Sequence, residues 1–179
     1  YIACVDHLGG FDPDTLECRE EKTAFWINIF NVLIIHGVIE LGIHTSVKEI
    51  PGFFRRIAYD IGGLTFSAED IEHGILRANH RLPNRLRRAF RRGDERQRFA
   101  LSAVDPRIHF ALVCASASCP PIEVYTAENL DNDLTVSGRT FLNAGGCRID
   151  RDRHTVHLSK VFKWYADDFG ANDAERLRF

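Results

Sequence analysis

The residue best suited to covalent chemistry is Cys119, which follows a run of small side chains from Ala115 to Ser118. Such a loop leaves backbone N–H groups uncovered, and loops carry many of the binding and catalytic residues of proteins. A cysteine attacks as its thiolate, so it needs an imidazole or another positive field that lowers the thiol pKa from about 8.5. We therefore predict a nucleophile at Cys119. The other cysteines are expected to be small buried hydrophobes: Cys4, Cys18, Cys114 and Cys147.

Two histidines are candidates for the base that activates Cys119. His109 begins the apolar stretch 108–114, which predicts a buried strand that carries the histidine about 16 Å from Cys114. The loop up to Cys119 spans at most about 17 Å, so it can just fold back to His109. His73 belongs to a separate predicted helix and faces no such limit.

An acid would complete the site by orienting the histidine. Glu72 and His73 are neighbours in sequence and do not face each other on a helix, so Glu72 would serve His109 more readily. Asp70 and Glu69 are the partners on the same face if His73 is the base. A surface acid in a weak ion pair is the alternative interpretation of Glu72.

An oxyanion donor is harder to assign. Pro120 follows Cys119 and has no N–H. The side-chain amides of Asn28 or Asn31 could donate instead, which would explain amides on an apolar helix. Their alternative is a buried hydrogen bond to the backbone, which is the more frequent arrangement for buried amides.

The elements that must position these residues follow from the hydrophobic pattern. Residues 24–41 are apolar on nearly every face and Gly42 is a plausible C-cap, which predicts a helix in the centre of the domain. His36 on this helix is expected to be a satisfied core histidine. A pair of strands over 53–60 and 64–66 is predicted around the turn at Gly62 and Gly63. A helix is predicted over 69–78 with Ser67 as its N-cap.

The C-terminal third predicts three further elements. They are a helix from Thr126 to about Leu142, an antiparallel hairpin over 148–150 and 155–158 with His157 exposed, and an aromatic-rich helix over 159–169. The fold class is therefore α+β. We expect a single compact domain over residues 1–179, with a central buried helix, a small mainly antiparallel sheet and flanking helices.

Composition narrows the class of protein. With 179 residues, 45% of them hydrophobic, and a net charge of −2, the chain suits one globular domain. The longest apolar run is too short and too often interrupted for a membrane span. Methionine is absent, even at position 1, so we interpret the chain as a piece of a longer gene product. The spacings offer no zinc site and no phosphate-binding glycine loop, so neither a metal nor a cofactor is expected.

A basic segment between Arg77 and Arg98 holds nine arginines and two acids. Nucleic acid is not the favoured partner, because only Phe90 and Phe99 lie nearby and no known module is present. A solvated loop and helix face is the simpler interpretation. If the chain is not an enzyme, we expect this segment to be the face by which an interaction domain docks onto an anionic partner.

Four stretches in the same order resemble the family called domain of unknown function 547 (DUF547). They are 22–36, which includes KTAFWINIFN, then 71–77 (IEHGILR), 105–121, which runs from DPRIHFAL to SCPP, and LSK with FKWY over 158–165. Phe30 stands where the family more often has tyrosine. The resemblance implies bacterial proteins, often exported to the periplasm or beyond, and C-terminal domains of plant leucine-zipper proteins.

The resemblance further implies a cysteine-peptidase-like site of Cys119, His109 or His73, and Glu72. We therefore expect a thiol-dependent hydrolase or acyltransferase that acts on a peptide or small amide. The alternative is a non-catalytic interaction domain, or one that binds a peptide or a thiol such as glutathione. The sequence leaves the oligomeric state open.

Overall fold

The computed structural model describes residues 5–83, 87–115 and 122–179. Cys4, Cys119 and Pro120 therefore lie outside the described residues. The chain forms the predicted mixture of helices with two small antiparallel sheets, which is an α+β fold. The α-helices are α2 (Arg19–Glu40), α3 (Phe53–Arg56), α4 (Leu130–Phe141), α5 (Lys160–Trp164), α6 (Ala166–Phe169) and α7 (Asp173–Arg176).

The strands form two hairpins. Strand β1 (Ala58–Ile61) pairs with β2 (Leu64–Ser67), and β3 (Cys147–Asp150) pairs with β4 (Thr155–Leu158). Two π-helical segments, η4 (Asp70–Leu76) and η7 (Leu142–Gly146), complete the regular structure together with short 3-10 helices. The 3-10 helices are η1 (His7–Gly10), η2 (Pro13–Thr15), η3 (Val47–Glu49), η5 (Glu95–Phe99) and η6 (Pro106–Phe110).

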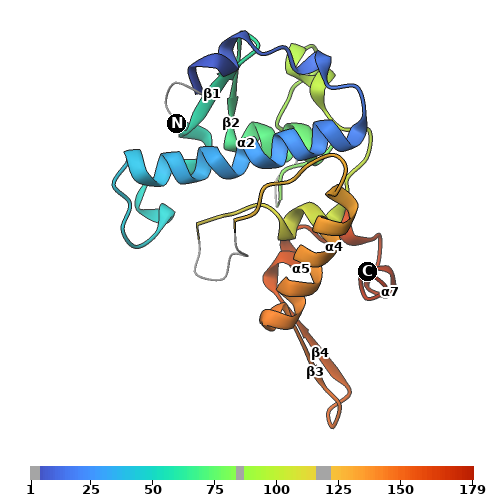
Figure 1. Cartoon of the computed structure of the whole chain (residues 1–179). Coiled ribbons are helices and arrows are strands. Elements are labelled where there is room, and N and C mark those ends of the chain that lie inside the picture. Colours follow the sequence, from blue (N-terminus) through green and yellow to red (C-terminus); the bar gives the residue numbers. More distant parts are fainter. Residues whose placement is uncertain (1–4, 84–86, 116–121) are drawn as a thin grey trace.

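Helix α2 runs through the middle of the molecule, as its apolar pattern predicts (Figure 1). It begins at a capping box in which the Cys18 thiol accepts from the Glu21 N–H and the Glu21 carboxylate accepts from the Cys18 N–H. Trp26 packs against Phe66 of β2 and against Phe99, with ring centroids 5.0 and 6.3 Å away. Helix α2 therefore lies at the centre of the larger hydrophobic core.

Among the described residues, α2 is also the one helix long and apolar enough to cross a membrane by length and composition. Half of its most apolar stretch is buried inside the molecule, where it packs against β2 and η4. No clear membrane-spanning segment emerges from this helix, because the core helix of a globular domain passes the same test.

The β1–β2 hairpin leads directly into η4, which carries Glu72 and His73. Ser67 caps this turn as predicted: the Asp70 N–H donates to the Ser67 hydroxyl at 3.1 Å, and that hydroxyl donates to the Asp70 carboxylate at 2.6 Å. Gly74 allows Phe90 to pack on the helix, because a Cβ there would lie 2.4 Å from the Phe90 ring. The helix therefore approaches the basic segment closely at this point.

Three predicted elements differ from the structure. Residues 108–114 are not a strand, because Asp105 caps the 3-10 helix η6 and Pro106 occupies its first position. The predicted helix over 159–169 breaks at Tyr165 into α5 and α6. Residues 53–56, expected at the start of a strand, form the helical turn α3.

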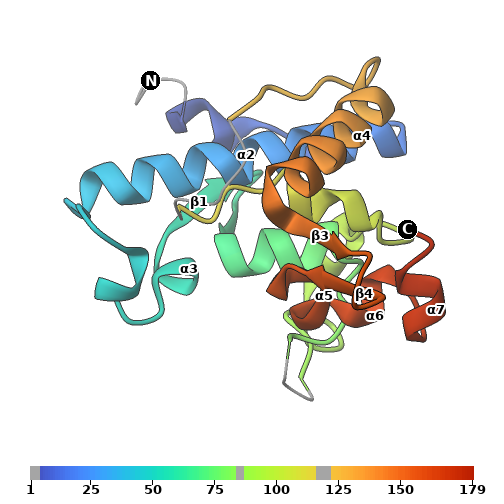
Figure 2. The ribbon, with the colours of Figure 1, turned by 90° about the horizontal axis from the view of Figure 1, so that it is seen from below.

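The remaining C-terminal elements follow the prediction more closely. Helix α4 begins at Leu130, four residues after the expected cap at Thr126. The β3–β4 hairpin has the expected strands, and His157 is exposed. A second, smaller core of Phe110, Phe162 and Phe169 joins α5 and α6 to η6. This small core brings the C-terminal helices against the segment that carries His109 (Figure 2).

Candidate active site

The polar centre of the molecule is the carboxylate of Asp168, whose side chain is fully buried. His109 Nε2 lies 2.8 Å from its Oδ2, and the exposed His80 lies 3.3 Å from its Oδ1. Arg77 donates through Nε to Oδ2 at 2.5 Å and through Nη2 to Oδ1 at 3.0 Å. This fork is the bidentate geometry that binds a carboxylate most firmly.

These partners decide the charge of Asp168. Burial opposes ionisation, but the hydrogen bonds from His109 and Arg77 outweigh it and hold the pKa of Asp168 well below its ordinary value. Asp168 is therefore an acceptor-only carboxylate at neutral pH. It follows that the Nε2 atom of His109 carries the proton of this hydrogen bond, and that neutral His109 has its lone pair on Nδ1.

The ring of His109 is contacted on its face by Tyr165, in addition to the hydrogen bond that Nε2 makes with Asp168. Tyr165 stacks on it with centroids 3.9 Å apart and an interplanar angle of 24°. The Tyr165 hydroxyl donates to Glu72 Oε1 at 2.6 Å. Burial, together with the nearby Glu72 carboxylate, raises the pKa of Tyr165 above its usual range, so this hydroxyl keeps its proton. Glu72 therefore acts on His109 through Tyr165 instead of directly.

His73 lies in the same cluster but in a different state. Arg77 Nη1 donates to its Nδ1 at 3.1 Å, which places the proton of neutral His73 on Nε2. Burial, countered in part by Glu72, lowers the pKa of His73. The Glu72 Oε1 atom, 3.7 Å from Nδ1, forms an ion pair only with protonated His73. The arrangement therefore keeps His73 neutral and its Nδ1 occupied.

The structure places Glu72, His73 and His109 in one cluster. Glu72 was expected to serve His109 more readily than His73, but its carboxylate lies 3.7 Å from His73 Nδ1 and reaches His109 only through Tyr165. The partners expected for His73 lie elsewhere: Asp70 bonds Ser67 and Arg96, and Glu69 faces arginines of the surface. Glu72 is not a surface acid, since its side chain is 12% exposed.

Asn28 and Asn31 both bind backbone. Asn31 Nδ2 donates to the Ala111 carbonyl at 3.0 Å, and its Oδ1 accepts from the Val113 N–H at 2.9 Å. Asn28 makes the matching pair of bonds with the N–H and the carbonyl of Tyr125. The two amides of α2 therefore clamp the chain on both sides of residues 116–121.

The exposure of the described cysteines differs from the prediction. Cys18 and Cys114 are exposed and Cys147 is half-buried, so the expectation of buried hydrophobes is wrong for these three. Cys18 is a helix cap, a role for which its thiol must face the helix end. Cys119, the predicted nucleophile, falls outside the described residues. In the described ranges no group of three or more His, Cys, Asp and Glu side chains is placed to hold a metal ion.

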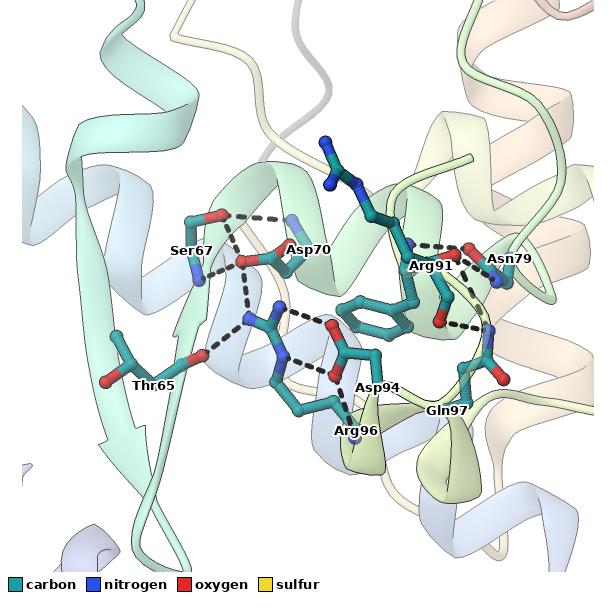
Figure 3. A network of polar contacts seen from close by, with 9 residues as sticks. Thr65, Ser67, Asp70, Asn79, Arg91, Asp94, Arg96 and Gln97 are labelled. Carbon is teal, nitrogen blue, oxygen red and sulfur yellow. Dashed lines mark hydrogen bonds and ion pairs between the residues drawn. The ribbon is translucent and has the colours of Figure 1, made fainter. Parts of the chain in front are cut away.

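Five of the eight arginines that the structure describes in the basic segment donate to an acceptor. Arg77 is 3% exposed and belongs to the Asp168 cluster. Figure 3 shows Arg96 joined to Asp94, to Asp70 and to the Thr65 carbonyl. The other arginines with acceptors are Arg87 with Glu69, Arg88 with the Asn79 carbonyl, and Arg98 with Asp14.

Asp168, Tyr165 and Arg77 are the site residues that the sequence did not single out. Tyr165 belongs to the predicted aromatic-rich helix and Arg77 to the nine arginines of the basic segment. Both also lie in stretches that carry the family resemblance, over 158–165 and 71–77, but the sequence assigns neither a role in the site. Asp168 is one of two adjacent acids near a helix end and carries no motif. The signal available for Arg77 was its place four residues after His73 on a helix, which puts both on one face.

Comparison with known families adds one finding. The model of the family described as "Protein of unknown function, DUF547" matches residues 13–142. The chain belongs to this family. The DUF547 match includes Glu72, His73, His109 and Cys119, and it ends before Tyr165 and Asp168. Neither the curated proteins nor the solved structures returned a match.

Proposed function

We propose that the chain is a thiol-dependent hydrolase or acyltransferase of the cysteine-peptidase type, with Cys119 as nucleophile and His109 as base. The observation that supports this is the buried hydrogen bond of 2.8 Å between His109 Nε2 and the Asp168 carboxylate. A carboxylate in that position fixes one tautomer, stabilises the imidazolium and leaves Nδ1 to exchange a proton with a thiol.

His109 is favoured over His73 for a reason of geometry and charge. Nδ1 of His73 is occupied by Arg77, and burial lowers the pKa of His73. No described residue hydrogen-bonds Nδ1 of His109.

The proposed reaction is acyl transfer. His109 Nδ1 takes the proton of Cys119, and the thiolate attacks the carbonyl carbon of a peptide or small amide to form a C–S bond. The C–N bond then breaks, and the imidazolium returns its proton to the departing amine. Water, or an acceptor amine or thiol, releases the acyl group in the second half. Asp168 remains ionised throughout.

The test is the pH dependence of Cys119 alkylation by iodoacetamide, mapped by mass spectrometry against Cys18 and Cys147. We expect the apparent thiol pKa of Cys119 to lie below the ordinary value of about 8.5. His109→Ala should return it to that value, whereas His73→Ala should leave it low. Asp168→Asn, which keeps the shape of the side chain, should raise it in part, and the exposed neighbour variant Asp167→Asn should not.

Circular dichroism of each variant separates a lost base from a lost fold. An ordinary thiol profile at Cys119 in the unmodified chain would contradict the proposal. A low value that survives in His109→Ala and disappears in His73→Ala would assign the base to the other histidine.

A further inference from the structure

The C-terminal part of the chain carries a concentration of exposed apolar side chains. Six of the eleven large hydrophobic residues exposed in the described chain fall after residue 142. They are Ile149, Val156, Leu158, Trp164, Leu177 and Phe179. Scattered single exposed hydrophobics are ordinary, but a cluster of this kind marks a surface that another phase or molecule covers.

The β3–β4 hairpin orders part of this cluster into one face. Cys147 pairs with Leu158 and Ile149 with Val156, so these four side chains share one side of the ribbon. Ile149 is 64% exposed and Val156 is 43% exposed. The hairpin projects away from the body of the molecule, so its apolar side is not covered by the rest of the described chain (Figure 1). We call this side the hairpin face.

A hollow continues the hairpin face at its base. Its volume is about 460 Å³, and Leu158 belongs to both surfaces. The remaining apolar lining comes from Phe162, Ala166 and Leu177 of the three last helices and the turn that follows them. A hollow of this volume can hold part of an acyl chain.

Two lysines lie at the hollow. Lys160 and Lys163 line the hollow, and neither forms an ion pair with a described residue. Arg148, Arg151 and Arg153 lie on the hairpin. The acids of this region are almost as many: Asp150 faces Arg153 at 3.9 Å, Asp173 is bound by Arg176, Asp152 lies in the turn, and Asp167 and Glu175 lie on α6 and α7. An apolar surface bordered by unpaired lysines is complementary to a bilayer with acidic headgroups.

We propose that the hairpin face and the adjoining hollow dock the chain onto an anionic membrane surface. Ile149, Val156 and Leu158 enter the boundary between headgroups and acyl chains, and Lys160 and Lys163 bind lipid phosphates. Ala166, which lines the hollow, and Asp168 both belong to α6, but the Asp168 side chain is turned to Arg77 and His109. The proposal does not depend on the thiol chemistry.

The test is co-sedimentation of the 179-residue chain with two kinds of vesicle, phosphatidylcholine alone and phosphatidylcholine mixed equally with phosphatidylglycerol. We expect binding to the acidic vesicles and a steep loss of it with added salt. The double variant Lys160→Glu with Lys163→Glu should weaken binding by about 25-fold or more, since each basic residue near the surface contributes about fivefold. Ile149→Ser with Val156→Ser should weaken it by at least about tenfold.

Two controls match these changes. Val136→Ser alters an equally exposed valine on α4, and Lys48→Glu reverses an exposed lysine far from the hairpin, so both should bind as the unmodified chain does. Far-UV circular dichroism checks that each variant folds. Absence of binding, equal binding to both vesicles, or self-association of the chain that the hairpin variants abolish would overturn the proposal.

Discussion

Two arginine-centred networks lie at opposite ends of the π helix η4, and they differ in what their partners can do. Arg96 reaches the start of the helix, where it holds Asp70 and Asp94 and is 24% exposed (Figure 3). Arg77 follows the end of the helix, where it holds Asp168 and is 3% exposed. Both arginines use a fork of N–H groups on carboxylates.

The difference lies in the third member of each network. Arg96 adds the Thr65 carbonyl, a group that cannot change its charge, so its network joins the loop at Asp94 to the β1–β2 hairpin and does nothing more. Arg77 adds His73, and its carboxylate adds His109. An arginine network becomes suited to chemistry when an imidazole shares its acid and keeps one nitrogen uncommitted.

The largest effect should come from removing the buried acid. Asp168→Ala leaves the Arg77 guanidinium buried without its carboxylate, which costs about 3–5 kcal/mol of the free energy of unfolding. Urea denaturation followed by circular dichroism measures this cost. Asp167→Ala is the matched control, and it should stay within about 0.5 kcal/mol because Asp167 is exposed. Equal values for the two variants would mean that Arg77 finds other partners.

A smaller effect is expected in the Arg96 network. Asp94→Ala removes an N-cap and an ion pair that is partly open to water, so we expect a loss of about 1–2 kcal/mol. The ion-pair part should shrink in high salt, whereas the cost of Asp168→Ala should not. Urea midpoints at low and high salt check this, with the exposed neighbour variant Glu95→Ala as the control. A cost as large as that of Asp168→Ala would erase the distinction between the networks.

The smallest effect at neutral pH concerns His73. Its folded-state pKa is lowered, so below about pH 6.5 the unfolded chain binds a proton that the folded chain does not bind. Stability from this group is therefore complete above that pH and is lost as the pH falls through the folded-state pKa. His73→Gln should flatten the fall in the urea midpoint between pH 7 and pH 5, and His157→Gln, on the exposed strand β4, should not. An unchanged slope would mean that His73 is already charged in the folded chain.

Local patterns were sufficient to predict much of the fold. The uniform apolarity of 24–41 predicted the central helix, and turn residues predicted both hairpins, because each signal acts within a few residues. Residues 108–114 failed because an apolar run marks burial without choosing between strand and helix. The choice is made by the Asp105-Pro106 pair, because Asp105 caps η6 and Pro106 occupies its first position.

The site was predictable only in the part that motifs carry. Glu72, His73 and His109 combine a recognisable stretch with a residue type that serves as acid or base, and the structure places them in one cluster. Arg77 and Tyr165 lie in such stretches too, but their residue types did not indicate a role. Asp168 did not, because its role depends on contacts with residues 91 and 59 positions earlier. The residues next to an acid in the sequence do not indicate that a distant arginine and a distant histidine will hydrogen-bond to it in the folded chain.

The break between helices α5 and α6 at Tyr165 directs both Tyr165 and Asp168 onto His109. This has a consequence for the order in which the residues of the site are synthesised. At 5–20 residues per second, about 3–12 seconds separate the synthesis of His109 from that of Asp168. For that interval a nascent chain carries the imidazole without the carboxylate that selects its tautomer. The site is therefore completed by a segment that is translated well after the central helix and the first hairpin.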